Sequence, residues 1–178
     1  MNFYISDLHF GHKSVIEFDN RPFQDAEEMD QKLIQLWNDK VCEDDQVYVL
    51  GDFAFRNEKP PEWYLSQLKG SRHLIPGNHD RKLLKNETAM GYFESVDKMM
   101  HVKDMGSQIC LCHYPIADWF GMYWGSWHIY GHIHNSENES ARYMKKMEKA
   151  LNASACINHY APVTFKELIS NNEKWKGS

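Results

Sequence analysis

The sequence predicts an α/β fold in which two mixed β-sheets pack together and helices cover the outside. In the first half, strand-like apolar runs alternate with helical patterns, an order that favours parallel strands. In the second half, strand-like runs follow one another without long helices between them, which favours antiparallel pairing. A chain of 178 residues can bury one sizeable core, so we expect a single domain spanning 1–178.

The first half alternates predicted strands with predicted helices. In the longest helix, acidic residues fill the first turn, and Met29, Leu33 and Trp37 recur at helical spacing. A pair of prolines opens the next helix, which ends at Gly70. We expect strands at 2–5, 46–50 and 73–75, helices at 25–41 and 60–70, and a short helix or helical turn at 81–90.

The second half begins with strand-like runs and then becomes highly charged. The charged stretch at 136–149 predicts an exposed helical excursion. A further apolar run follows it, and the C-terminal part predicts a helix or turn. We expect strands at 99–105, 108–114, 127–133 and 151–157, and the helix or turn at 163–170.

Composition and charge exclude several classes of function. The formal charge is −5 and no basic stripe is present, so we expect no broad nucleic-acid surface. No apolar run approaches the ~20 residues that a membrane span needs. The N-terminus lacks the pattern of a signal peptide, and we therefore expect a cytoplasmic protein without membrane contact.

Polar residues that can bind metals gather where the predicted strands end. Residues two apart in an extended segment face the same side, so a carboxylate or imidazole pair can point into one site. Ligands of α/β folds collect beyond the carboxyl ends of the strands. Oxygen and imidazole ligands without thiolates suit Mn²⁺, Fe or Zn²⁺. The candidate residues are Asp7, His9, Asp52, Asn78, His79, Asp80, His113, His132 and His134.

Five short motifs in this order carry a family resemblance. They are DLH at 7–9, GD at 51–52, GNHD at 77–80, a lone His113, and GHIH at 131–134. The series resembles the signature of the calcineurin-like metallophosphoesterase superfamily, and the tail resembles that of its small bacterial and phage-type members. The resemblance implies a four-layer αββα sandwich of two mixed sheets flanked by helices.

The resemblance also implies a role for each motif residue. Asp52 would bridge two divalent metal ions, His79 would be a catalytic acid or charge stabiliser, and Asp80 would orient His79 or hold the turn. We expect Mn²⁺ first, with Fe, Zn²⁺, Ni²⁺ or Mg²⁺ as alternatives. One ion would be held by Asp7, His9 and His134, and the other by Asn78, His113 and His132.

The implied reaction is hydrolysis of a phosphate mono- or diester by a hydroxide that bridges the two metal ions. The substrate would be a small phosphate ester. The aromatic-rich segment 117–127 lies between His113 and His132, and it favours a nucleotide-like phosphodiester whose base stacks on the loop. The same segment could instead be a hydrophobic cap or a contact between subunits.

Five further residues are candidate substrate contacts. Protein phosphatases of the superfamily place a phosphate-binding arginine at the offset of Arg56 from Asp52, although the residues between them differ here. The others are His12, Arg21, Trp119 and Trp124.

Three other functions remain open at this level. One is a non-catalytic metal-binding scaffold for a protein partner, and another is a nuclease. A phosphoprotein phosphatase is the third. The natural substrate, the metals and the oligomeric state are not determined by the sequence.

Overall fold

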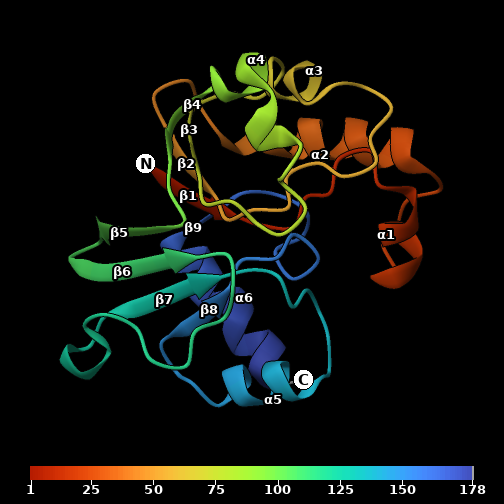
Figure 1. The fold of residues 1–178 in the computed structure, drawn as a ribbon. Coiled ribbons are helices and arrows are strands. Elements are labelled where there is room, and N and C mark those ends of the chain that lie inside the picture. The colour runs from red at the N-terminus through yellow and green to blue at the C-terminus, as the bar shows by residue number, and fades with distance from the viewer. Residues whose placement is uncertain (178) are drawn as a thin grey trace.

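Two mixed β-sheets lie between layers of helices in the computed structural model, which describes residues 1–177 (Figure 1). The first sheet has the strand order β4-β3-β2-β1-β9. Strands β1 to β4 are mutually parallel, and β9 pairs antiparallel with β1. The bounds of these strands are Asn2–Ile5 for β1, Gln46–Val49 for β2, Ser71–Leu74 for β3, Phe93–Val96 for β4 and Val163–Thr164 for β9.

The second sheet has the order β5-β6-β7-β8. Its strands are β5 Met99–Asp104, β6 Ser107–Cys112, β7 Trp127–Tyr130 and β8 Ala150–Asn152. Strands β5 and β6 form an antiparallel hairpin, as the sequence predicts, but β6 pairs parallel with β7 and β7 parallel with β8. The expectation of antiparallel pairing is therefore wrong for these two pairs. The segments 113–126 and 131–149 are long enough to return the chain to the end of the sheet where the preceding strand began, which a tight hairpin turn cannot do.

The longest helix has nearly the bounds that the sequence predicts, whereas other helices are shorter than expected. Helix α2 begins where Asp25 accepts a hydrogen bond from the Glu28 N–H, and it buries Met29, Leu33 and Trp37. The α-helices are α1 Lys13–Phe18, α2 Ala26–Lys40, α3 Pro61–Leu65, α4 Glu87–Met90, α5 Glu139–Lys145 and α6 Phe165–Gly177, and the 3₁₀ turns are η1 Leu83–Lys85 and η2 Met122–Trp124.

Three buried clusters separate four layers. Side chains alternate across β1, so Phe3 and Ile5 face the α1–α3 side of the first sheet while Tyr4 faces the second sheet. The second cluster fills the space between the two sheets with residues such as Leu111 and Ile129. The third cluster lies between the outer face of the second sheet and α5. The expected αββα sandwich is thus confirmed, with α6 packing at the edge against β1, β8 and β9.

The structure contains elements that the sequence patterns do not reveal. Helix α1 and strand β4 are too short to show a clear period, and β4 alternates only between half-buried and exposed residues. The expected strand 151–157 ends at Asn152, because the chain turns at 154–160. Within residues 1–177, none of the helices combines the length and the hydropathy that crossing a bilayer requires.

Candidate metal centre

The predicted ligands meet where strands of both sheets end. Loops that follow β1 and β2 run side by side, because the Asp7 N–H bonds the Gly51 carbonyl at 3.0 Å and the His9 N–H bonds the Asp52 carbonyl at 2.9 Å. In the second sheet, the Gly131 N–H bonds the His113 carbonyl at 2.9 Å. These backbone bonds bring segments from the two sheets to one edge, which is where α/β folds bind ligands.

Several of the ligand residues have an unusual backbone conformation. Asp7, His9, Asp52, His132 and His134 all have positive φ, between 48° and 69°. Non-glycine residues rarely adopt this left-handed conformation, and such residues concentrate at functional sites where the surrounding structure enforces it. The fold therefore holds five side chains in directions that ordinary strand or turn geometry would not give them.

The first group of ligand atoms comprises Asp7, His9, Asp52 and His134, whose nearest ligand atoms all lie within 4.8 Å of one another. His9 Nε2 lies 3.3 Å from His134 Nε2 and 3.7 Å from Asp52 Oδ2. His134 Nε2 lies 3.5 Å from Asp7 Oδ1. All four side chains thus converge on one point, as the sequence predicts for the first metal.

The second group comprises Asp52, His113 and His132, with Asn78 beside them. His113 Nε2 lies 3.7 Å from Asp52 Oδ2 and 3.2 Å from Asn78 Oδ1. Asp52 belongs to both groups, which is the arrangement that a bridging carboxylate requires.

The hydrogen bonds around the imidazoles show that the groups fit cations. Nδ1 of His113 donates to the Leu50 carbonyl at 2.7 Å, so its Nε2 presents a lone pair to the oxygens of Asp52 and Asn78. Burial lowers the pKa of His9 well below its ordinary value, and burial also lowers the pKa of His132. Imidazole nitrogens and carboxylate oxygens that converge in this way form a donor set suited to Mn²⁺, Fe or Zn²⁺.

Asp19 is a partner of the centre that sequence reasoning missed. Its carboxylate accepts a hydrogen bond from His134 Nδ1 at 2.8 Å and bonds from Arg21 Nε and Nη2 at 3.1 and 3.0 Å. Burial favours the neutral carboxyl, but the bonds from His134 and Arg21 outweigh it and lower the pKa of Asp19. Such a carboxylate–histidine pair orients a metal ligand and increases its basicity.

Two buried serines and a backbone amide orient Asp7. The Asp7 Oδ2 atom accepts bonds from the hydroxyls of Ser6 and Ser154, the latter at 2.5 Å, and from the His132 N–H at 3.0 Å. The Oδ1 atom shares the His132 N–H, at 3.1 Å, and faces His134 Nε2 at 3.5 Å. Neither serine belongs to a motif in the sequence, and only the close approach of the β1 and β8 ends reveals them.

His79 and Asp80 have different roles in the structure. The His79 N–H donates to Asp52 Oδ1 at 2.9 Å, and its imidazole Nε2 lies 3.9 Å from Asp52 Oδ2 with a third of the side chain exposed. The buried Asp80 carboxylate accepts the N–H groups of Asp52, Phe53 and Gly77 at 2.7–3.0 Å. Of the two roles expected for Asp80, holding the turn is the one that these bonds support.

Gly51 and Gly77 allow the loops after β2 and β3 to pack closely. Gly51 has a φ of 81°, and a Cβ atom there would lie 2.4 Å from the Gly77 nitrogen and 2.6 Å from His113 Nδ1. A Cβ at Gly77 would lie 2.3 Å from Asp52 Oδ1. Any side chain at either position would displace a ligand of the centre.

Aromatic side chains flank the centre on two sides, and sequence reasoning missed both. The Phe55 ring lies 4.1 Å from that of His79 and 4.9 Å from that of His12. On the other side, the Tyr114 ring lies 4.8 Å from that of His132. Both residues follow closely after a ligand in the sequence, but nothing in the sequence shows that their rings face the centre.

Three of the five candidate substrate contacts lie at or around the ligand loops. His12 lies beside the centre, with its Nδ1 atom 3.4 Å from His9 Nδ1, and Arg56 covers the Phe55 ring at 5.2 Å. The buried Arg21 guanidinium bonds Asp19 and the carbonyls of Leu8 and Asp7, so it supports the loop.

Trp119 and Trp124 are not brought to the metal centre. Trp119 is buried in the third cluster against His128, and Trp124 lines a pocket that shares no residue with the metal groups. The expectation that the loop 117–127 stacks a substrate at the metals therefore lacks support from these two side chains.

Comparisons with known proteins show what the chain is similar to. A profile of the calcineurin-like phosphoesterase family matches residues 3–171. The uncharacterized protein MJ1445 of Methanocaldococcus jannaschii is 31% identical over 98% of this chain and 92% of its own length. The gene 66 protein of Mycobacterium phage L5 is 39% identical over 43% of this chain and 38% of its own length. A protein of unknown function from Aquifex aeolicus, AQ665, has a similar structure, with a TM-score of 0.75 and 25% identity over 96% of this chain and 98% of its own.

Proposed function

The chain belongs to the calcineurin-like phosphoesterase family, and from its donor geometry we propose that it is a binuclear metal-dependent phosphoesterase. Family membership supports a hydrolase of phosphate esters, and the two groups of ligand atoms support binding of divalent metal ions. We propose Mn²⁺ as the metal because the set contains oxygen and imidazole donors and no thiolate.

The observation that carries the proposal is the position of Asp52 in both ligand groups. A carboxylate shared by two groups holds two cations close together. Two divalent ions against the carboxylates of Asp7 and Asp52 leave a local positive charge, although the whole chain carries −5. A phosphate ester would be attracted to this edge of the sheets.

Two divalent ions would supply Lewis-acid polarisation of the phosphoryl oxygens and lower the pKa of a water molecule. The protein supplies a proton donor beside the substrate. The His79 backbone is tied to Asp52, and its partly exposed imidazole can hold a proton beside the departing ester oxygen. General-acid assistance of this kind contributes about 10²–10⁴-fold to a rate.

The two flanking aromatic rings support a small diester as the substrate. Phe55 lies against His79 and His12, and Tyr114 lies against His113 and His132. A phosphodiester has two substituents on phosphorus, so each could contact one ring, whereas a monoester would use only one. A nucleotide-like diester with a planar base fits this pair of aromatic surfaces.

Hydrolysis of bis-p-nitrophenyl phosphate and p-nitrophenyl phosphate with added Mn²⁺ tests the proposal. We expect the diester to be the better substrate and Asp52→Asn to abolish turnover of both. His79→Ala should slow an ester with an alkoxide leaving group far more than one with p-nitrophenolate, because the alkoxide is the stronger base and gains more from a proton. Asp39→Asn is the matched control for Asp52→Asn, since its side chain is exposed on α2 and lies outside the ligand loops.

Two results would contradict the proposal. One is activity that survives in Asp52→Asn at the wild-type level. The other is a lack of turnover of both esters by protein that binds two Mn²⁺ ions per chain, which would instead favour a metal-binding scaffold for a protein partner.

A further inference from the structure

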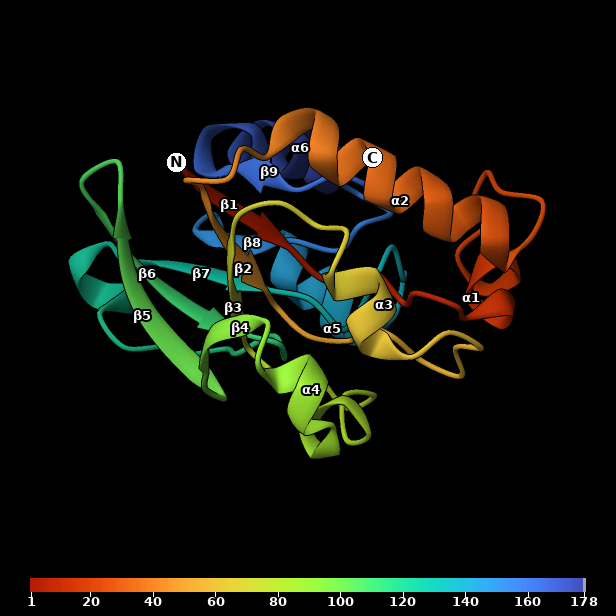
Figure 2. The ribbon, with the colours of Figure 1, turned by 90° about the horizontal axis from the view of Figure 1, so that it is seen from above.

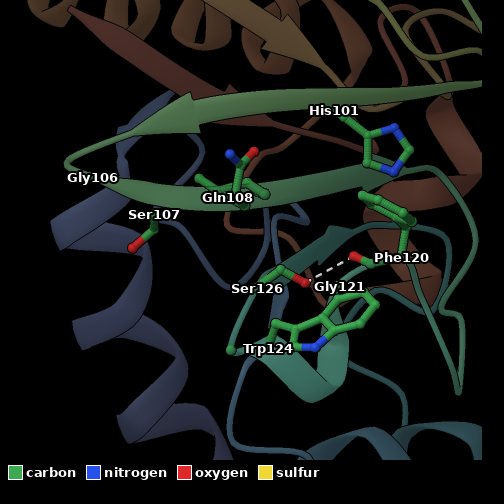
Figure 3. A pocket seen from close by; sticks show the side chains of 10 residues that line it. His101, Gly106, Ser107, Gln108, Phe120, Gly121, Trp124 and Ser126 are labelled. Carbon is green, nitrogen blue, oxygen red and sulfur yellow. Dashed lines mark hydrogen bonds between the residues drawn. The ribbon is translucent and has the colours of Figure 1, made fainter.

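A cavity lies at the opposite end of β6 from the metal centre. Its volume is about 380 Å³, and it is formed by the β5–β6 hairpin and the loop before β7 (Figure 3). Gln108 lines it near the start of β6, whereas His113 follows the end of that strand. At about 3.3 Å per residue these positions are roughly 16 Å apart along the chain direction. In Figures 1 and 2 the hairpin also lies on the far side of the molecule from α1, which follows the His9 loop.

Three aromatic or heteroaromatic rings border this cavity. The Phe120 ring makes edge contacts with both His101, at 5.4 Å between centroids, and Trp124, at 6.4 Å. Figure 3 shows Trp124 on one side of the opening, with His101 and Gln108 on the other. Trp124 is 85% exposed and Phe120 74% exposed. Large apolar surfaces of this kind are seldom left open beside a concave pocket unless something binds there.

The loop that carries Trp124 is held in place by several hydrogen bonds. The Ser126 hydroxyl donates to the Phe120 carbonyl at 2.9 Å and accepts from Trp119 Nε1 at 3.1 Å. Lys149 Nζ donates to the Gly125 carbonyl at 2.9 Å. The exposed indole is therefore presented from a cross-linked loop, and binding a ligand would require little further ordering.

The opposite wall of the cavity offers unused polar groups. In the described chain, residues 1–177, the side-chain amide of Gln108 and the ring nitrogens of His101 have no hydrogen-bond partner. A glutamine amide presents a donor and an acceptor side by side, which matches the N6 and N7 edge of adenine. An indole presents a flat surface on which a base stacks.

We propose that this cavity binds the adenine base of a nucleoside or nucleotide, with Trp124 stacking on the ring and Gln108 bonding its edge. The site is separate from the metal centre and does not depend on the proposed hydrolysis. Its volume falls within the range of small-molecule pockets. The same loop continues directly from His113 and Tyr114, so a ligand here would contact the segment that leads into the metal centre.

Calorimetric titration of the metal-loaded protein with adenosine tests the proposal, because adenosine carries no phosphate for the metals. We expect saturable binding that weakens about tenfold or more in Trp124→Ala, in line with the loss of a stacked base. Gln108→Ala should reduce the preference for adenosine over inosine, which lacks the N6 donor. The matched control is Tyr123→Ala, since Tyr123 is 84% exposed on the same 3₁₀ turn but does not line the cavity. Thermal melts would establish that all three variants are folded.

Three outcomes would overturn the proposal. The first is no saturable binding at millimolar adenosine, and the second is equal affinity in Trp124→Ala and the wild type. The third is a wild-type dimer, seen by light scattering, that Trp124→Ala dissociates. That result would show that a second copy of the chain covers the cavity.

Discussion

Replacing Asp19 by Asn tests whether the hydrogen bond behind His134 sets the affinity of one metal site. The native carboxylate accepts the His134 Nδ1–H at 2.8 Å, which directs the Nε2 lone pair towards Asp7 and His9. The asparagine amide retains one acceptor oxygen but no charge. The imidazole therefore becomes a weaker base and a less firmly oriented ligand.

The expected loss is 10–100-fold in affinity at the site of Asp7, His9 and His134. This corresponds to about 1.4–2.7 kcal/mol of binding free energy. The other site should keep its affinity, because His113 is oriented by the Leu50 carbonyl at 2.7 Å and not by Asp19. Asp19→Asn should thus weaken one binding event and leave the other unchanged.

Calorimetric titration of metal-free protein with Mn²⁺ would measure both sites. Asp39→Asn, an exposed position on α2, makes the same chemical change away from the centre and serves as the control. The substitution also leaves the buried Arg21 without its carboxylate partner, and breaking such a pair costs about 3–5 kcal/mol of stability. Titrations must therefore be done well below the melting temperature of the variant.

Equal weakening of both sites, or no weakening of either, would refute this reasoning. The first result would indicate a general loss of structure. The second would mean that the carboxylate does not tune its ligand.

Three further predictions follow from the glycine contacts, the pKa shifts and the metal sites. Gly51→Ala and Gly106→Ala impose the same backbone strain, since both glycines have φ near 80°, but only the Gly51 Cβ would lie against Gly77 and His113. Denaturant unfolding should show that Gly106→Ala lowers the free energy of unfolding by about 1–2 kcal/mol and that Gly51→Ala lowers it further. Equal losses in the two variants would contradict the close approach at Gly51. Burial raises the pKa of Asp30 to about 6, so the folded state binds this proton more tightly than the unfolded chain does. The wild type should lose stability relative to Asp30→Asn as pH rises from about 4 to 6, by up to about 1.4 kcal/mol per pH unit; a difference in unfolding free energy that stays constant over this range would be the contrary result. Removing metal with a chelator should lower the melting temperature, since metal at 100 times its dissociation constant adds about 2.7 kcal/mol to stability, whereas an unchanged melting curve would argue against metal binding to the folded state.

Much of the fold and the site follows from local patterns in the sequence. The amphipathic repeat in α2 and the apolar runs of β1, β2 and β3 are visible because each buried face repeats at a fixed period. The positions of the metal ligands can also be predicted, because each motif comes directly after a predicted strand. Asp7, Asp52 and His113 are brought together in the structure as the motifs predict.

Other features depend on contacts between segments that are distant in sequence. The parallel pairing of β6 with β7 is set by the route of the loop between them, and a strand's own residues carry no sign of its partner's direction. The role of Asp80 depends on which backbone amides reach its carboxylate, and these come from the loop after β2. The sequence placed Trp124 near the metals because its loop joins two ligands, yet the loop turns back along β6 to a separate cavity.

Residue types and their spacing predict which donor atoms the chain offers and that these atoms follow the ends of strands. Both are local properties of the sequence. Which of the atoms converge, as with Asp52 in both ligand groups, depends on the packing of the two sheets. The same packing sets which residues support the ligands, as with Asp19 behind His134 and Ser154 behind Asp7. Hydrogen bonds and metal ligation act over only a few ångströms, so distant segments contribute to one centre only after the fold has brought them together.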